Sequence, residues 1–365
     1  MKRPPQRKSV RKPAESVRRR SSAPRGPNKL QMGDIARLAG VDISTVSRAL
    51  NGSALVKDET RLRIEELARS LNYSINVGAR NLRLQQNRTV AVVVPYDATT
   101  RQHISDPFFV SMLGSLADSL TERGYDMLLS RVDAERLDLV GDLAASGRAI
   151  GVILIGQWHH HDQLNELAAR HAPIVVWGAQ LPQQLYCTVG SDNIAGGSLA
   201  TEHLAGLGRR RIAFFGNVKL PEIGQRFEGY RRTLARHAIA IDPLLVRPTA
   251  FVDGSAERAV TELIKQKIPF DAIFASSDLL ALGAMTALRE QGKRVPQDVA
   301  VVGYDDIELA RYYHPALTTI RQPVVKGGVT LVDALLAVVH GGHPEPTMLP
   351  AELIVRNSSV EKSHA

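Results

Sequence analysis

The chain has 365 residues, of which 44% are hydrophobic, and it carries a formal net charge of +9. This length supports a large core and more than one domain. The single cysteine, Cys187, excludes an internal disulfide and suits a reducing cytosol. No apolar run follows the N-terminal positive charges as in a signal peptide, and no apolar stretch is long enough to span a membrane. We therefore expect a cytoplasmic protein.

Residues 1–29 form a basic segment that contains eleven Lys or Arg residues and one acid, Glu15. The segment has hardly any large apolar side chains, which predicts a disordered tail. The rest of the chain has almost no net charge, and this distribution suits a nucleic-acid-binding end attached to a body with another role. One interpretation of the tail is a basic arm that adds non-specific attraction to DNA. The alternative is a solvated tail without a role, or a start codon placed too far upstream.

The segment 32–51 has the pattern of two short helices joined by a sharp turn. Ile35, Ala36, Leu38 and Ala39 give the first helix an apolar stripe. Gly40 suits a tight turn because glycine adopts backbone angles that other residues resist. Asp42 is a suitable N-cap for the second helix, and Val46 and Leu50 are spaced to pack back on the first. A third helix is predicted by apolar residues at Ile64, Leu67, Ala68 and Leu71.

The outer face of the second helix predicts DNA recognition. Short hydroxyl side chains and an arginine there suit base edges and phosphates in a major groove. The alternative is an ordinary helical hairpin with a solvated face. The candidate residues are Ile43, Ser44, Thr45, Ser47 and Arg48.

Beyond residue 88, short β-branched runs alternate with helical segments, which predicts parallel sheets covered by helices. The number of strands favours two doubly wound parallel sheets that face each other across a cleft. The predicted strands are 90–95, 125–129, 151–155, 174–177, 185–190, 211–215, 270–275 and 299–303. The predicted helices are 107–123, 160–171, 193–207, 225–238, 255–267 and 278–291.

Ligands of such sheets bind beyond the carboxyl ends of the strands, which selects candidate binding residues. Asp305 and Asp306 follow one strand, Ser277 and Asp278 follow another, and Arg226 opens a helix after a third. Carboxylates accept hydrogen bonds from vicinal sugar hydroxyls, and arginine donates a fork of them. Asp278 and Asp192 are more readily explained as helix caps. Phe251 and Trp177 are either faces for a sugar ring or plain core, and the other lobe would supply Tyr96, Asp97, Asp106 and Phe108.

Several motifs that suggest enzymes or metal sites are better explained otherwise. Adjacent histidines at 159–161 do not share a helix face and fit a surface loop that opens a helix. Gly196-Gly197 lacks the spacing of a dinucleotide loop, and Cys187 lies in a predicted strand as a small core residue. No activated nucleophile or phosphate loop is present. We therefore expect no enzyme activity, no cofactor and no metal.

Residues 30–88 resemble the headpiece and hinge of the LacI/GalR family of bacterial repressors. The matching residues are Asp34-Ile35-Ala36, Ala39-Gly40-Val41, Thr45-Val46-Ser47-Arg48-Ala49-Leu50-Asn51, Thr60-Arg61, Leu71-Asn72-Tyr73, Asn76, Ala79-Arg80 and Leu82. The resemblance implies DNA contacts from Met32, Asn51, Asn76, Ala79, Arg80 and Leu82 as well. The family usually has proline before the hinge asparagine, where this chain has Ile75.

The hinge, residues 76–84, is expected to be coil when free and helical on DNA, because it is too short for a stable isolated helix. Two such helices, one from each copy of a dimer, would hold Leu82 as a wedge in the minor groove.

The resemblance continues to about residue 356. It implies an effector-binding core similar to periplasmic sugar-binding proteins, in which Arg226 and Asp305 match the main effector contacts. The family's asparagine before the aspartate is Ser277 here. The loop 96–106 is longer than the family norm and resembles a subgroup associated with α-linked or plant-derived glucosides. The matching core motifs are Asp106-Pro-Phe-Phe109, Ser191-Asp192-Asn193, Gly196-Gly197, His203-Leu204, Leu207-Gly208, Gly229-Tyr230, Ser277–Gly283, Val301–Asp306 and Leu317–Pro323.

The predicted protein is a small all-α helix-turn-helix headpiece followed by an α/β two-lobed core. We expect a homodimeric repressor of a near-palindromic DNA operator that is controlled by a small sugar, such as a glucoside. The alternatives are a purine or a sugar phosphate as corepressor, a sugar-binding protein without DNA output, and an enzyme on the same fold. Little chain follows residue 355, so no tetramer-forming helix is expected. The expected parts are 1–29 tail, 30–75 headpiece, 76–88 hinge, 89–356 core and 357–365 tail.

Overall fold

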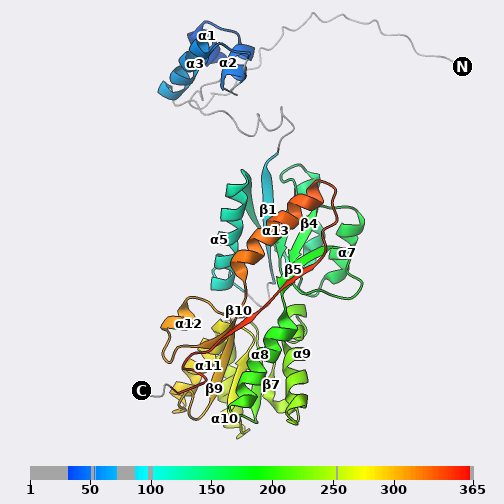
Figure 1. Cartoon of the computed structure of the whole chain (residues 1–365), viewed down its shortest axis with the longest axis vertical. Coiled ribbons are helices and arrows are strands. Elements are labelled where there is room, and N and C mark those ends of the chain that lie inside the picture. The colour runs from blue at the N-terminus through cyan, green and yellow to red at the C-terminus, as the bar shows by residue number, and fades with distance from the viewer. Residues whose placement is uncertain are drawn as a thin grey trace, which may run out of the picture. The chain divides into compact units, whose positions relative to one another are not determined.

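The computed structural model describes residues 32–50, 53, 55–71, 87–97, 102–251 and 254–361. The chain divides into two compact units, one within Met1–Leu84 and the other within Gln85–Ala365 (Figure 1). None of the helices in these ranges is long and apolar enough to cross a membrane.

The smaller unit, which we call the headpiece, consists of three helices. They are α1 (Met32–Ala39), α2 (Ile43–Leu50) and α3 (Asp58–Ser70). Ile35, Val46, Ala49 and Ile64 are completely buried and join the three helices into one core. The predicted helix-turn-helix and its third helix are therefore present.

The larger unit contains two six-stranded sheets, each with helices on both faces. The first lobe has strand order β11-β5-β4-β3-β1-β2, and the second has β12-β10-β9-β8-β6-β7. All neighbouring strands are parallel except β10 and β12, which run antiparallel at the edge of the second sheet. The two predicted doubly wound sheets are thus confirmed, with one antiparallel edge strand.

The first lobe is built from the N-terminal half of the unit and a late return of the chain. Its strands are β1 (Thr89–Tyr96), β2 (Asp126–Asp133), β3 (Val152–Ile155), β4 (Ile174–Trp177), β5 (Cys187–Ser191) and β11 (Thr347–Leu349). Its helices are α5 (Pro107–Glu122), η1 (Ala134–Val140), α6 (Asp142–Ala145), α7 (His161–Ala169) and α13 (Val324–Val339). Helices α5 and α13 cover one face of the sheet, and η1, α6 and α7 cover the other.

The second lobe follows the same plan. Its strands are β6 (Ile212–Phe215), β7 (Val246–Arg247), β8 (Ala272–Ala275), β9 (Ala300–Asp305), β10 (Thr318–Arg321) and β12 (Glu352–Ile354). Its helices are α8 (Asn193–Gly206), α9 (Pro221–Arg236), η2 (Pro243–Leu245), α10 (Ser255–Lys265), α11 (Asp278–Glu290) and α12 (Leu309–Tyr312).

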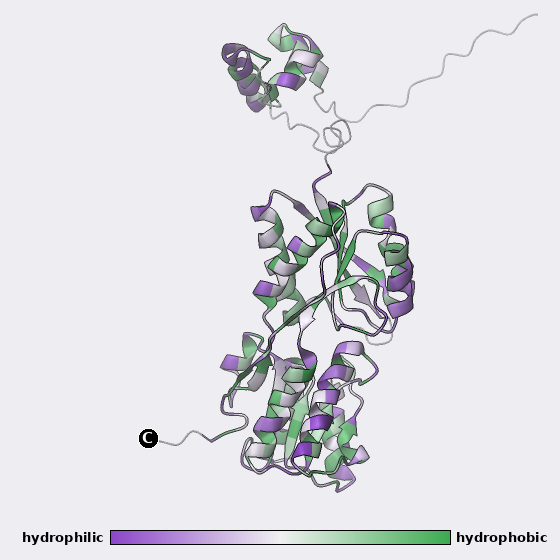
Figure 2. Cartoon of the chain, turned by 45° about the vertical axis from the view of Figure 1, so that its right-hand side comes forward, coloured by the Kyte–Doolittle hydropathy of each residue, from purple (hydrophilic) through white to green (hydrophobic). Residues whose placement is uncertain are grey.

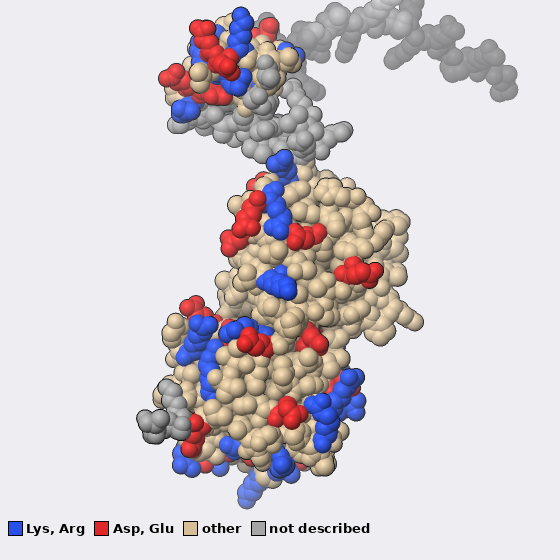
Figure 3. Space-filling model, viewed as in Figure 1, with Lys and Arg blue, Asp and Glu red and all other residues tan. Residues whose placement is uncertain are grey.

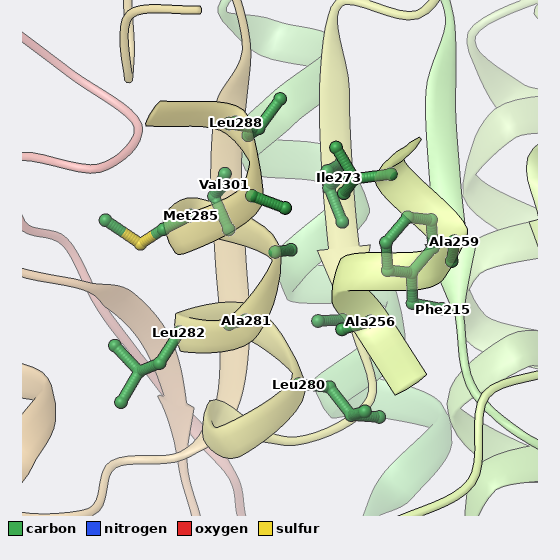
Figure 4. Close-up of a cluster of buried hydrophobic side chains, with 14 of the residues drawn as sticks. Phe215, Ala256, Ala259, Ile273, Leu280, Ala281, Leu282, Met285, Leu288 and Val301 are labelled. Atoms are coloured by element: carbon green, nitrogen blue, oxygen red, sulfur yellow. The ribbon is translucent and has the colours of Figure 1, made fainter. Parts of the chain in front are cut away.

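Burial of apolar strands explains why both sheets form. The strands β3, β4, β6 and β8 are buried at every position, as expected for parallel strands covered on both sides. On one face of the second sheet, side chains of α10 and α11 interdigitate with Phe215, Ile273 and Val301 (Figure 4). The inner strands of both sheets consist mainly of hydrophobic residues, whereas the helices around them contain hydrophilic residues as well (Figure 2).

The chain passes between the lobes three times, after β5, after β10 and after β11 (Figure 1). Helices α13, η1 and α6 and the short strands β7, β10, β11 and β12 are not among the elements predicted from the sequence. Residues 357–365 are predicted to form a tail, which is wrong for Ser358 and Ser359 because both are buried. Ser358 donates its hydroxyl to the carbonyl of Val301 at 2.6 Å, which ties this segment to β9.

Candidate functional site

The turn between α1 and α2 positions the predicted recognition surface. Gly40 has a φ of 65°, which glycine adopts without steric cost. The carbonyl of Asp42 accepts hydrogen bonds from the amides of Thr45 (2.9 Å) and Val46 (3.1 Å), so α2 begins directly after the turn. Arg63 of α3 donates to the carbonyl of Ala39 at 3.0 Å and holds the end of α1.

The first turns of α2 present the predicted DNA-contact residues on the headpiece surface. Ile43 is 53% exposed, and Ser44 and Arg48 are also exposed. Thr45 and Ser47 are half-buried. A large apolar side chain beside polar ones at a helix surface suits contact with base edges and thymine methyl groups.

Of the other predicted DNA contacts, Met32 is the one that lies within the described residues. Met32 is half-buried and packs against the headpiece core. Leu38 was expected in the core stripe of α1, but it is 58% exposed, because Ile35, Ala36 and Ala39 alone form the buried face. The remaining candidates lie outside the described residues, namely Asn51, Asn76, Ala79, Arg80 and Leu82.

In the larger unit, a cavity of about 100 Å³ lies between the two lobes at the carboxyl ends of their strands. It has room for several water molecules. Aromatic, acidic and amide side chains line it together with one arginine. The lining residues are Gln102, Asp106, Phe108, Phe109, Ile155, Gly156, Trp158, Trp177, Leu220, Glu222, Ile223, Arg226, Phe251, Ser277, Asp305 and Gln322.

The first lobe contributes an acid and a group of aromatic rings. Asp106 caps α5 by accepting the amide of Phe108 at 3.0 Å, and Gln102 donates to its other oxygen at 3.3 Å. Burial raises the pKa of the Asp106 carboxyl. The ring centroids of Phe108 and Trp177 lie 6.4 Å apart and form an apolar wall.

Arg226 is the principal cation of the second lobe's wall. Its Nε donates to the Asn193 side chain at 2.9 Å, and its Nη1 donates to the carbonyl of Ser276 at 2.5 Å. The guanidinium carbon lies 3.7 Å from the centre of the Tyr304 ring. With only 6% of its surface exposed, Arg226 is held rigidly for hydrogen bonding.

Close packing of α8 on α9 brings these groups together. A Cβ added at Gly197 would lie 2.0 Å from the carbonyl oxygen of Arg226, and one added at Gly229 would lie 2.1 Å from that of Ile194. Gly196 similarly leaves room for the Tyr304 hydroxyl. The adjacent glycines that do not fit a dinucleotide loop therefore serve helix packing.

Asp305 ends β9 at the cavity wall with a φ of 122°. Its Oδ1 accepts a hydrogen bond of 2.7 Å from Gln322, which lies in the connection from β10 to α13. Burial raises the pKa of Asp305 to about 7, while the charge of Arg226 opposes the rise and that of Asp106 adds to it. The cavity thus holds a carboxylate and a guanidinium, which together accept and donate hydrogen bonds.

Two neighbouring aspartates have structural roles instead. Asp306 forms ion pairs with Arg321 (2.8 Å) and Arg356 (2.5 Å), away from the cavity lining. Asp278 was expected to cap α11, but Ser277 is the cap and accepts the amide of Leu280.

The carboxylate of Asp278 is fully buried beneath the cavity wall. It accepts the amide of Ile307 at 2.9 Å and the hydroxyl of Thr319 at 2.5 Å. Burial raises its pKa well above the usual range, and Asp305 adds to the effect. Asp278 thus links β9 and β10 and does not line the cavity. Asp192 does cap α8, by accepting the amide of Ala195 at 2.9 Å.

Of the other predicted ligand contacts, some line the cavity and others do not. Phe251 and Trp177 line the cavity, whereas Tyr96 and Asp97 do not. Tyr96 lies under the guanidinium of Arg131, 5.2 Å from its ring centre. Residues 98–101 of the long loop lie outside the described residues.

Several residues that line the cavity are not among those predicted from the sequence. Gln102, Trp158, Glu222 and Gln322 all line it. Glu222 stands four residues before Arg226, a spacing that places both on one helix face and was a usable signal. Trp158 also packs into an apolar cluster of the second lobe, which no local pattern indicates.

The histidines at 159–161 have ordinary partners. His160 lies 3.5 Å from Glu135, and His161 Nδ1 is 2.8 Å from the Tyr186 hydroxyl. Across the part of the chain that the structure describes, no group of three or more His, Cys, Asp or Glu residues could hold a metal ion.

Comparisons with known proteins agree with this arrangement. The family model for bacterial regulatory proteins of the lacI family matches residues 31–76. The model for a periplasmic binding protein-like domain matches residues 201–359. Among curated relatives, the transcriptional regulator CelR of Thermobifida fusca is 35% identical over 89% of this chain and 96% of its own. The ribose operon repressor of Haemophilus influenzae is 33% identical over 84% and 90%.

Solved structures give the same result. A lac repressor dimer bound to operator and the anti-inducer ONPF superposes with a TM-score of 0.82 at 26% identity, covering 91% of this chain and all of that one. A complex of CelR with cellobiose superposes with a TM-score of 0.67 at 33% identity, covering 90% and 100%. The similar proteins are transcriptional regulators that cover both units of this chain.

Proposed function

Because the chain belongs to the lacI family of bacterial regulatory proteins, we propose that it is a sequence-specific DNA-binding transcriptional repressor. A small sugar in the cavity between the lobes controls its affinity for the operator. The observation that carries this proposal is the combination of an exposed recognition helix with a cavity that contains Arg226, Asp305 and aromatic rings.

On DNA, the recognition helix α2 enters the major groove with Ile43, Ser44 and Arg48 toward the bases. Two copies form a homodimer on a near-palindromic operator, as in the dimeric lac repressor complex to which the chain is similar. The hinge 76–84, which contains Leu82, lies outside the described residues, and its change from coil to helix on the operator stays a prediction. Lys and Arg side chains are mixed with Asp and Glu side chains on both the headpiece and the larger unit in Figure 3, so DNA contact is assigned to the headpiece by its exposed helix α2 and not by charge.

In the cavity, Asp305 accepts hydrogen bonds from ligand hydroxyls and Arg226 donates to ligand oxygens. Trp158, Trp177, Phe108 and Phe251 provide flat apolar surfaces for a sugar ring. The similarity to a CelR–cellobiose complex supports a glucoside as the effector. The ligand changes operator affinity by binding more tightly to one arrangement of the lobes than to the other.

We assign no catalytic role to the cavity, and a repressor of chromosomal genes acts in the cytoplasm. The rival ligands are a purine or a sugar phosphate acting as corepressor. A sugar-binding protein without DNA output is the alternative from a different functional class.

The test begins with selection of the sequences that the full-length protein binds from randomised DNA. A fluorescence-anisotropy titration on the selected, cognate DNA follows, with scrambled DNA as control. Saturable binding to the cognate DNA only, reversed by cellobiose or a related glucoside, is the expected result. Equal binding to both DNAs refutes the repressor assignment. Release by a purine or a phosphate ester, but by no free sugar, refutes the sugar assignment alone.

A further inference from the structure

Glu222 is an acidic residue on the wall of the cavity, at the place where the two lobes meet. It lies in the first turn of α9, one helical turn before Arg226, and both line the cavity. From the first lobe, Ile155 at the end of β3 and Gly156 directly after it line the same cavity. The carboxylate of Glu222 is therefore carried where a ligand held between the lobes would lie.

Acidic side chains outnumber basic ones on the cavity wall. Asp106, Glu222 and Asp305 line it, whereas Arg226 is the single Lys or Arg among the described lining residues. The guanidinium of Arg226 is also engaged, by the two hydrogen bonds and the Tyr304 ring described above. When its acids are ionised, the cavity has an excess of negative charge.

This charge balance restricts the ligand. Ionised carboxylates only accept hydrogen bonds, so the ligand must supply donors such as hydroxyl groups. A phosphate ester brings two further negative charges into an enclosed site of low dielectric, where repulsion between like charges is strong. Arg226 alone cannot offset this repulsion.

We propose that Glu222 sets the charge class of the ligand, so that the cavity binds uncharged polyhydroxyl compounds and rejects their phosphate esters. This inference rests on the proposed function, in which the cavity is the effector site. The alternative role is purely structural: as an acidic residue in the first turn of α9, Glu222 would only stabilise this helix by interacting with the helix macrodipole. The experiment must separate these two roles.

The first measurement is calorimetric binding of glucose, glucose 6-phosphate, cellobiose and cellobiose 6′-phosphate to the full-length protein. Each phosphate should bind about tenfold more weakly than its parent sugar, or worse. Glu222→Gln keeps the shape of the side chain and should strengthen phosphate binding. The ratio of the affinity for a sugar to the affinity for its phosphate should therefore be smaller than in the wild type. Glu228→Gln is the matched control, because Glu228 lies on the same helix but pairs with Arg231 and Arg232 outside the cavity.

The second measurement needs no ligand. Charged or titratable groups facing Glu222 are Arg226 on its own helix, Asp106 and Asp305 on the cavity wall, and Tyr186. Burial raises the pKa of Glu222, so its ionised form lowers the stability of the folded state as pH rises above the unfolded pKa. Glu222→Gln should therefore raise the melting temperature relative to wild type more at pH 8 than at pH 5. A pure macrodipole role predicts the opposite sign.

Tighter binding of a phosphate than of its parent sugar overturns the inference, as does an unchanged ratio in Glu222→Gln. If none of the four compounds binds, the sugar assignment of the proposed function fails. The melting comparison then still separates the two roles of the carboxylate: a melting temperature of Glu222→Gln that does not rise relative to wild type at pH 8 overturns the inference, whereas a rise keeps Glu222 as a buried charge of the cavity.

Discussion

The guanidinium of Arg226 lies against the ring of Tyr304, with its central carbon 3.7 Å from the ring centre. Both side chains donate to the same oxygen of Asn193, Arg226 at 2.9 Å and the Tyr304 hydroxyl at 3.3 Å. A cation stacked on a buried aromatic ring and held by fixed acceptors has little freedom left to lose when a ligand binds. The buried Tyr304 thus helps to hold Arg226 rigidly at the cavity wall.

Arg226→Ala and Asp305→Ala should each raise the sugar concentration needed for operator release by about 5- to 150-fold, while operator affinity in the absence of sugar is unchanged. Each change leaves a ligand group without its partner in an enclosed site, at a cost of about 1–3 kcal/mol of binding free energy. Operator-release titrations with wild type and both variants measure this. Normal release in both variants would remove these residues from the site.

Gly197→Ala should destabilise the second lobe by about 3 kcal/mol, because the added Cβ would lie 2.0 Å from the Arg226 carbonyl oxygen and push α8 from α9. Gly206→Ala on the same helix is the control, since its Cβ would meet nothing within 4 Å. That control should be neutral or stabilising by up to about 1 kcal/mol. Urea unfolding of both variants gives the two free energies, and equal values would contradict the packing argument.

Sugar affinity should increase between pH 6 and pH 8. Burial raises the pKa of Asp305 in the unliganded protein to about 7, and ligand hydroxyls donate to its ionised form. Binding therefore lowers this pKa, and below about pH 7 a proton must leave Asp305 when the sugar binds. The cost of releasing this proton weakens the sugar affinity by up to about tenfold at pH 6. Calorimetry in buffers with different ionisation enthalpies detects the released protons. Asp305→Asn should flatten the profile, and a wild-type profile that is already flat would exclude Asp305 as the titrating group.

Arg48→Ala should weaken specific operator binding by about 1–3 kcal/mol and largely spare non-specific binding, because Arg48 is exposed on α2, the helix that we propose reads base edges. Mobility-shift titrations on cognate and scrambled DNA compare the two. Equal losses on both DNAs would mean that Arg48 contacts only phosphate.

The sequence by itself determined the headpiece, the class of the core and part of its cavity. Three short helices follow from apolar periodicity and from Gly40, whose φ of 65° the turn requires. Continuous apolar runs such as Ile174–Trp177 indicate strands buried on both faces, and their alternation with helices indicates parallel sheets. Arg226 and Asp305 could be selected because residues that follow strands of a parallel sheet meet at one edge.

Only the tertiary structure decided which of the similarly placed polar residues line the cavity. Asp305 and Asp306 are adjacent in sequence, but one lines the cavity and the other pairs with Arg321 and Arg356. Asp278 follows a strand as expected and yet is buried under the cavity wall. There its carboxylate accepts hydrogen bonds from the Thr319 hydroxyl and the Ile307 amide. The orientation of each carboxylate depends on partners far away along the chain, which local sequence does not encode.

The same reason explains the residues that were missed. Gln322 reaches the cavity because the chain crosses between the lobes after β10, and Trp158 reaches it because the lobes close on each other. Short polar strands such as Thr318–Arg321 are stabilised by neighbouring strands and not by their own apolar pattern. Local periodicity records which face of an element is buried, whereas the contacts that complete the cavity come from elements that meet only in the folded chain.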